Sequence, residues 1–317
     1  MHDDVDDDVD DVTRRGCFRS SVGAVVIGAA LVIVLGTSLH DRRTDAADPD
    51  GPARPPDLAA AGGVTSTVTL RLADDGEWEG AVPADVRAVL GSVVDALLPH
   101  VPGAGVIVIE VRPRGGPISL FERAEDGAVR VHLNTGGTFW SQYAYQFGHE
   151  LCHVFCRFDR DDTGNRWFEE ALCELASIYV LRRMADAWRE TPPYPNWRDY
   201  ATSLADYAGR LIDEGRLPEG MALADWYARH RDVLPTVPTD RENARIVAVA
   251  LLPFFEDEPE LWAALPWLNA ARPSQPRTFR EHLGDWRRHV PPAHATAIET
   301  IAAAFGVELT DEAPPRD

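Results

Sequence analysis

Four short segments of the N-terminal half of the chain have strand-like patterns of hydrophobic and polar residues. They are residues 67–73, which alternate in hydrophobicity, and the strand-like runs 106–112, 118–123 and 128–134. Alternation is typical of β-strands with one buried face, and Gly-rich or polar turns separate the last three segments. Between the first two, apolar residues of 83–100 recur at the three- and four-residue spacing of a helix. The pattern predicts a small sheet with one helix beside it.

Two amphipathic helices are predicted between residues 141 and 179, joined by a polar loop at 159–165. At about 100° per residue, each has an apolar face and an opposite polar face. In the first helix these faces carry, respectively, Phe147, Leu151, Val154 and Phe158, and His149, His153 and Cys156. In the second they carry Phe168, Leu172, Leu175 and Tyr179, and Glu170, Glu174 and Ser177. The two polar faces can therefore face one ion.

Helical spacing continues through most of the chain after Tyr179. The predicted helical segments are 196–215, 221–234, 241–255, 260–270, 278–289 and 293–305. Proline and glycine separate them, and no repeat of fixed period is evident. The fold class predicted is α+β, with a small mixed sheet and two central helices followed by an all-α C-terminal part.

The N-terminal region shows neither pattern. Residues 1–19 begin with a block of aspartates and are predicted to be disordered by self-repulsion. Residues 20–39 carry no charge and, at roughly 30 Å as a helix, can cross a bilayer. They predict a transmembrane helix; the alternative is a cleaved signal peptide, although no clear cleavage site follows Leu39. Residues 40–63 are rich in Asp, Ala, Pro and Gly and predict a flexible linker.

The net charge of −20 changes which partners are expected. Proteins that bind nucleic acid present a basic surface, so this acidic chain argues against nucleic acid as a partner. The length of 317 residues allows one large or two small domains with a substantial core. Neither property predicts an oligomeric state.

The first central helix contains the sequence His149-Glu150-Leu151-Cys152-His153. Two histidines one helical turn apart can bind a single zinc ion through their imidazoles. Its position on an amphipathic helix, followed by a second helix with acidic residues on the polar face, favours a metal site over a solvated charged surface. Zinc is therefore the expected cofactor.

With the segment Trp167-Phe168-Glu169-Glu170-Ala171-Leu172-Cys173-Glu174, this motif resembles the two zinc-binding motifs of the gluzincin metallopeptidases, which include thermolysin and aminopeptidase N. The resemblance is specific over residues 141–179 and covers the rest only in outline. It implies Glu170 as the third zinc ligand. It also implies Glu174, one turn later, as the residue that orients His149 by a hydrogen bond. Glu169 points about 100° away from Glu170 and is the weaker ligand candidate.

The resemblance also implies the chemistry. Two neutral imidazoles and one carboxylate leave a tetrahedral zinc ion one position open to water, whose pKa falls towards about 7. Glu150 would take the proton from that water and return it to the leaving amine. The expected activity is zinc-dependent hydrolysis of peptide or protein substrates.

Two further expectations follow from the resemblance. In the zincin fold an edge strand beside the active site pairs with extended substrate, and residues 128–134 are the candidate, with an ordinary core strand as the alternative. Gluzincins also use a Tyr or His to stabilise the oxyanion, and Tyr227 is preferred here over His230, Tyr200 and Tyr207. No Gly-x-Met-Glu-Asn motif precedes the zinc motif. Aminopeptidase activity is therefore not supported.

Other interpretations remain open. In the metzincins the third ligand follows a glycine, and here Cys156 and Asp159 occupy those two positions, so Asp159 is an alternative ligand. Cys152, Cys156 and Cys173 could supply thiolates to a structural zinc site. Cys156 and Cys173 could instead form a disulfide, or the cysteines could be small buried hydrophobes. A catalytically inactive binding module is the remaining alternative.

The predicted domain organisation combines these elements. A disordered tail (1–19), a transmembrane helix (20–39) and a flexible linker (40–63) precede a zincin-like catalytic core (64–187). An α-helical C-terminal subdomain (188–308) and a disordered tail (309–317) follow. The predicted localisation is a single-pass membrane protein with the N-terminus inside and the catalytic domain outside.

Overall fold

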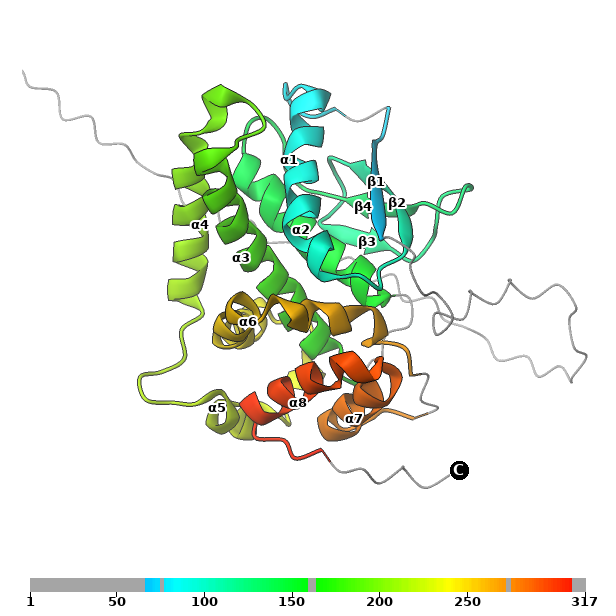
Figure 1. Ribbon diagram of the computed structural model, residues 1–317, viewed down its shortest axis with the longest axis vertical. Helices are drawn as coiled ribbons and strands as arrows, with labels where there is room; N and C mark the ends of the chain where they lie inside the picture. Colours follow the sequence, from blue (N-terminus) through cyan, green and yellow to red (C-terminus); the bar gives the residue numbers. More distant parts are fainter. Residues whose placement is uncertain (1–65, 75–76, 159–163, 272–274, 310–317) are drawn as a thin grey trace, which may run out of the picture. The chain divides into compact units, whose positions relative to one another are not determined.

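The strands predicted in the N-terminal half form one four-stranded sheet in this computed structural model. The structure describes residues 66–74, 77–158, 164–271 and 275–309. The strands are β1 (Thr67–Leu72), β2 (Val106–Arg112), β3 (Ile118–Leu120) and β4 (Val129–His132). Their order is β1-β2-β4-β3, with β2 parallel to β1 and β4, and β3 antiparallel to β4 (Figure 1).

The order of the strands corrects one expectation. Residues 128–134 were predicted to contain the substrate-binding edge strand, but β4 lies between β2 and β3. β4 fits the alternative, an ordinary inner strand, because β3 pairs antiparallel with its other side. β3 is therefore the edge strand at this end of the sheet, and it also contacts the helix that carries the histidines.

α1 (Pro83–Leu97) packs against β1 and both central helices. It begins with a proline in its first turn, where a missing N–H costs no hydrogen bond, and it continues into the short 3₁₀-helix η2 (Leu98–His100). The buried side chains recur at helical spacing, as the sequence predicts: Val86, Val89, Leu90, Val93, Val94 and Leu97. α1 thereby connects the sheet to the helical core.

α2 (Trp140–Cys156) and α3 (Arg166–Glu190) form the central helix pair. α2 ends although no glycine follows it, because Arg157 adopts the left-handed conformation with φ of 57°. That conformation costs a non-glycine residue about 1–2 kcal/mol. The helix therefore ends one turn after His153, and the chain turns back to place α3 against α2.

α3 is enclosed by α1, α2, α4 and α6, so it is buried on more than one face. Its predicted polar face is largely buried: the Glu170 side chain is 13% exposed, and Glu174 and Ser177 are only 2% and 0% exposed. Glu169, which lies outside that face, is only 4% exposed. Buried polar groups require hydrogen-bond partners. The partners of the three glutamates are described with the site below.

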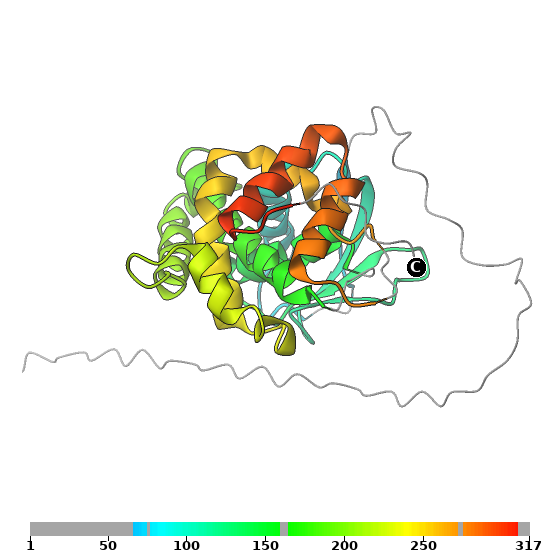
Figure 2. The same ribbon diagram turned by 90° about the horizontal axis from the view of Figure 1, so that it is seen from below.

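The C-terminal part is helical, as predicted, and packs beside the central pair (Figure 2). Its α-helices are α4 (Tyr200–Glu214), α5 (Leu223–His230), α6 (Arg241–Asp257), α7 (Phe279–His289) and α8 (Ala295–Ala304). Short 3₁₀-helices between them are η4 (Pro195–Trp197), η5 (Leu234–Thr236), η6 (Pro259–Trp267) and η7 (Pro292–His294). The predicted helix at 260–270 is thus the 3₁₀-helix η6, which contains Pro266 and contacts α2.

The expected fold class is corrected in one respect: the structure supports a mixed α+β fold but not a transmembrane helix. No helix in the described ranges is long and apolar enough to cross a membrane. Residues 20–39, where that helix was predicted, lie outside the described residues. Pro56–Asp317 form one compact unit, and α3 runs across the expected boundary between residues 187 and 188.

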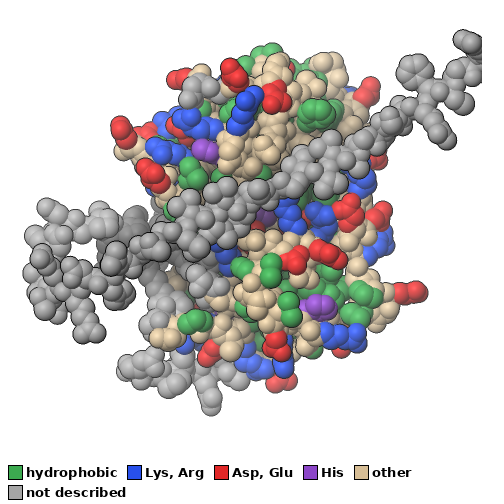
Figure 3. All heavy atoms as spheres, turned by 180° about the vertical axis from the view of Figure 1, so that it is seen from behind, with side chains coloured by type: hydrophobic (Ala, Val, Ile, Leu, Met, Phe, Trp, Pro, Cys, Tyr) green, Lys and Arg blue, Asp and Glu red, His purple; other side chains and the backbone are tan. Residues whose placement is uncertain are grey.

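Exposed ion pairs and buried aromatic side chains contribute different amounts to the stability of this fold. Acidic and basic side chains are interspersed on the face shown in Figure 3. Exposed ion pairs of this kind contribute roughly 0–1 kcal/mol each. The largest fully buried side chains include Trp188, Trp262, Trp286, Tyr143 and Phe168. Burial of these aromatic side chains is therefore the larger source of stability.

Candidate metal centre

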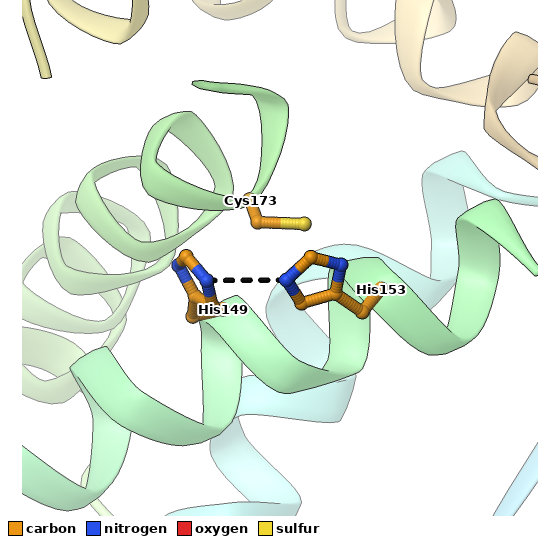
Figure 4. A group of neighbouring side chains, drawn as sticks. All are labelled: His149, His153 and Cys173. Carbon is orange, nitrogen blue, oxygen red and sulfur yellow. Dashed lines mark hydrogen bonds between the residues drawn. The ribbon is translucent and has the colours of Figure 1, made fainter. Parts of the chain in front are cut away.

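His149 and His153 project from one face of α2 towards α3, and their imidazoles face each other (Figure 4). Their Nε2 atoms are 3.2 Å apart. Glu170 on α3 places Oε2 3.3 Å from His149 Nε2 and 3.7 Å from His153 Nε2. The structure thus brings together the three side chains predicted from the sequence as zinc ligands.

The spacing of these three atoms fits a zinc ion. With bonds of about 2.0–2.1 Å and tetrahedral angles, two ligand atoms on one zinc ion lie about 3.3–3.4 Å apart. The observed separations of 3.2, 3.3 and 3.7 Å are close to that value. Two imidazoles and a carboxylate are also ligands that suit zinc. The donor set and its geometry therefore agree.

The three side chains influence one another electrostatically. Burial disfavours the charged imidazolium of both histidines, but hydrogen bonds with Glu170 outweigh it and raise the pKa of His149. The pKa of His153 is raised further, because Glu169 also bonds to it. Burial likewise disfavours charge on Glu170, yet the two imidazoles hold the pKa of its carboxyl below its usual range. The cluster therefore favours positive charge between the carboxylate and the two rings.

Cys173 offers a competing third ligand. Its Sγ lies within 4.8 Å of the histidine ligand atoms, and the side chain is fully buried (Figure 4). On one tetrahedral zinc ion, a sulfur and a nitrogen lie about 3.6 Å apart. The distances from Glu170 Oε2 already meet the corresponding requirement for oxygen, whereas 4.8 Å is only an upper bound for the sulfur. Glu170 is therefore the better-placed ligand.

Glu150 follows His149 in α2 and is 3% exposed. Ser119 in the edge strand β3 donates a hydrogen bond to Glu150 Oε2 at 2.9 Å. This bond fixes one carboxylate oxygen and attaches the edge of the sheet to the helix that carries the two histidines. The sequence gives no signal for Ser119, because it precedes Glu150 by 31 residues and lies in an ordinary strand pattern.

Glu169 contacts the side of the His153 ring that faces away from Glu170. Its Oε1 is 2.6 Å from His153 Nδ1, and it is only 4% exposed. A carboxylate accepts hydrogen bonds, so Nδ1–H donates and Nε2 is the nitrogen left for a metal. The first turn of α3 also stabilises negative charge at this position through the helix dipole. Glu169, predicted only as a weak ligand candidate, is thus the carboxylate that orients His153.

Glu174 does not lie where the resemblance implied. Its carboxylate accepts hydrogen bonds from Tyr145 Oη at 2.6 Å and from Arg245 Nε at 2.8 Å. Burial and the Glu174 charge raise the pKa of Tyr145 well above its usual value, so the phenol stays protonated and donates. Among the described residues, no hydrogen bond joins Glu174 to His149. Its observed partners give it a structural position between α2, α3 and α6.

We expect Arg245→Ala to lower the free energy of unfolding by about 3–5 kcal/mol, because it leaves the buried carboxylate of Glu174 without its ionic partner. Arg182→Ala is a matched control, since Arg182 also joins α3 to α6, through Glu256, but is 46% exposed. That control should cost about 0–1 kcal/mol. Urea denaturation of both variants measures the difference. Equal losses would show that burial of Glu174 does not set the cost.

The residues predicted to stabilise an oxyanion lie elsewhere. Tyr227 stacks on Trp167 with ring centroids 5.9 Å apart, and burial raises the pKa of its phenol. His230 stacks on Trp226, while the hydroxyls of Tyr200 and Tyr207 bond to residues at the start of α2. Within the described ranges, no hydrogen bond or ring contact joins these four residues to the predicted zinc ligands. None of them is brought to the metal centre.

Tyr227 lines a cavity of about 700 Å³ that does not include the metal centre. Aromatic side chains (Trp167, Tyr227, Phe279 and Phe305) and arginines (Arg231 and Arg277) contribute to its wall. In this cavity Tyr227 has both aromatic and charged neighbours, and the predicted zinc ligands are not among them. Tyr227, for which the resemblance implied an oxyanion role, is used here for packing.

The structure decides between the alternatives for the cysteines. Cys152, Cys156 and Cys173 are free and buried, so the Cys156–Cys173 disulfide considered as one alternative is not formed. This agrees with the interpretation that they are small buried side chains beside the histidines. Asp159, the alternative third ligand, lies outside the described residues.

Comparison of the chain with protein-family models, curated proteins and solved structures finds no match. The assignment of a function therefore depends on the two motifs and on the geometry of the site. That geometry includes three residues whose positions the sequence did not predict: Ser119, Glu169, and Asn269, whose Nδ2 donates to Glu169 Oε2.

Proposed function

We propose that this protein is a zinc-dependent metallopeptidase. The observation that supports it most strongly is the convergence of two imidazoles and one carboxylate, from His149, His153 and Glu170, at the spacing of zinc ligands. Catalytic zinc sites keep three protein ligands and one open position. Glu150, next to a ligand in the same helix, supplies the acid–base group that hydrolysis needs.

The side chains of the chain have separate tasks in this reaction. When bound, zinc supplies a Lewis acid that activates water and polarises the scissile carbonyl. Glu150 accepts the proton of the attacking water on its carboxylate and transfers it to the leaving amine. Ser119 holds one oxygen of that carboxylate, which limits the directions in which Glu150 can receive a proton. Glu169 holds the His153 ring in the tautomer that presents Nε2.

The edge strand β3 is the proposed docking site for an extended peptide. β4 occupies one side of β3, and in the described part of the sheet no strand pairs with its other side. An exposed strand edge can bind an extended chain through main-chain hydrogen bonds. Because the Ser119 side chain reaches Glu150, a peptide paired with β3 would lie beside the general base.

A second candidate function is a non-catalytic metal-binding module, in which Cys173 closes the coordination of the ion. The observation that favours it is the position of the Cys173 sulfur, buried and near both histidines. Structural zinc sites use four protein ligands and leave no open position. This module would bind zinc as tightly as a peptidase but would not hydrolyse a substrate.

Reconstitution of the full chain tests the proposal. Zinc is removed with a chelator and restored, and both zinc content and cleavage of an unstructured protein such as casein are measured. We expect one zinc ion per chain, hydrolysis in its presence, and loss of hydrolysis to background after its removal. Stoichiometric zinc without cleavage would favour the non-catalytic module. A chain that binds no zinc would overturn both functions.

A further inference from the structure

The amide of Asn269, in the turn that follows η6, makes two hydrogen bonds to the central helix pair. Its Nδ2 donates to Glu169 Oε2 at 2.6 Å and to the main-chain oxygen of Cys156 at 3.0 Å. Asn269 is 3% exposed, so neither bond competes freely with water. The residue thereby joins the first turn of α3 to the last turn of α2, across 100 residues of sequence.

These contacts extend the hydrogen-bonded chain that begins at the metal centre. His153 Nδ1 donates to Glu169 Oε1, and Asn269 donates to the other oxygen of the same carboxylate. The Glu169 carboxylate therefore has a partner on each oxygen and is held in one orientation. A buried carboxylate that lost one partner would be left with an unsatisfied acceptor, and it would move to find another.

We propose that Asn269 is a positioning residue for the metal ligand His153, acting through Glu169. The proposal rests on the zinc site proposed above. Groups that hold a ligating histidine from behind fix its ring and raise its strength as a ligand. Asn269 acts on the ring indirectly. It fixes the Glu169 carboxylate, and that carboxylate fixes the His153 ring. The C-terminal helical part of the chain thereby contributes to metal affinity without supplying a ligand.

The second hydrogen bond of Asn269, to the main-chain oxygen of Cys156, has an effect on stability that is distinct from the positioning of His153. The Cys156 oxygen belongs to the last turn of α2, where main-chain oxygens lack partners within the helix. Losing that bond would weaken the end of the helix whether or not Glu169 is involved. If Asn269 had a purely structural role, its substitution would lower the stability of the protein and leave the coordination of the metal unchanged.

A double-mutant cycle with Asn269→Ala and Glu169→Gln separates the two roles. Zinc affinity is measured by competition with a chromogenic chelator, and the cobalt-substituted proteins are compared by visible absorption. We expect Asn269→Ala to weaken zinc binding about 10–100-fold and to shift the cobalt spectrum. In the Glu169→Gln background, Asn269→Ala should cause little further loss, because the residue through which it acts is already changed.

Asn165→Ala is the matched control. Asn165 is also a buried asparagine at 2% exposure, and its Nδ2 donates to the main-chain oxygen of Arg277, which likewise lies in the C-terminal part. This variant should lose stability but keep the zinc affinity and cobalt spectrum of the unaltered chain. Unchanged affinity in Asn269→Ala, or equal losses in both Glu169 backgrounds, would overturn the positioning role alone. If the unaltered chain binds no zinc, the proposed function fails first and this inference fails with it.

Discussion

Substitution of Glu150 by glutamine is expected to leave zinc in place and to lower the rate of peptide hydrolysis by about 10²–10⁴-fold. Glutamine keeps the shape of the side chain, and its amide oxygen can still accept the hydrogen bond that Ser119 donates at 2.9 Å. It cannot take a proton from water. Because Glu150 is not among the three converging ligand atoms, metal binding should not change. Zinc content and kcat/KM on an unstructured peptide measure the two effects.

The outcome of this substitution distinguishes three assignments for Glu150. Loss of turnover with zinc retained supports a general base. Loss of zinc together with turnover would make Glu150 a ligand, and undiminished turnover would remove it from the mechanism. Glu256→Gln is a suitable control, because it makes the same chemical change in the surface pair with Arg182 and should alter neither quantity.

The elements of the fold were predictable where their signals are local. Residues 106–112 are a short run rich in Val and Ile and form β2, and the apolar spacing of 83–97 forms α1. The order of strands was not predictable in this way, because pairing joins segments distant in the chain. The alternation that identifies β4 carries no information on whether it has one neighbour or two. Hence the edge strand was assigned to β4 instead of β3.

The predicted ligands could likewise be identified because most of their signal is local in the sequence. His149 and His153 are one turn apart on α2, so their meeting is a property of the helix itself. Glu170 requires that α3 fold back on α2, and the polar stripe on α3 indicated that it would. The stripe did not indicate which further residues would serve the site. Its polar residues have partners on several neighbouring elements: Glu170 and Ser177 contact α2, whereas Glu174 is also bound by Arg245 of α6.

Glu169 and Glu174 show this limit clearly. Both are buried on α3, but Glu174 faces Arg245 of α6, whereas Glu169 faces His153 of α2. The spacing of Glu169 and Glu174 along the helix gives the directions of their side chains but not the residues they contact. Those residues depend on where α6 and η6 lie, which is set by the folding of the whole C-terminal part. Asn269 is a further example, because nothing in its sequence neighbourhood relates it to a histidine 116 positions earlier.

The choice between Glu170 and Cys173 as the third ligand decides between a catalytic and a closed site. Both project from the same helix towards the histidines, and they are separated by less than one turn. With Glu170 as ligand, zinc keeps an open position for chemistry; with Cys173 as an additional ligand, four protein groups close it. Substitution of Glu170 tests whether its carboxylate is a ligand, and substitution of Cys173 distinguishes the open from the closed arrangement.

Glu170→Ala is expected to weaken zinc binding by more than the roughly 100-fold typical of groups behind a ligand, and to abolish hydrolysis. Removal of its carboxylate deletes a ligand atom and takes away the negative charge that lies between the two imidazoles, although His153 keeps its bond to Glu169. Cys173→Ser, which keeps the size of the side chain, should leave both zinc content and hydrolysis unchanged. Cobalt substitution adds a direct readout, since a cysteine sulfur on cobalt gives an intense near-ultraviolet charge-transfer band. That band should be absent from the unaltered protein; if it is present and Cys173→Ser removes it, the site is closed and the peptidase assignment does not hold.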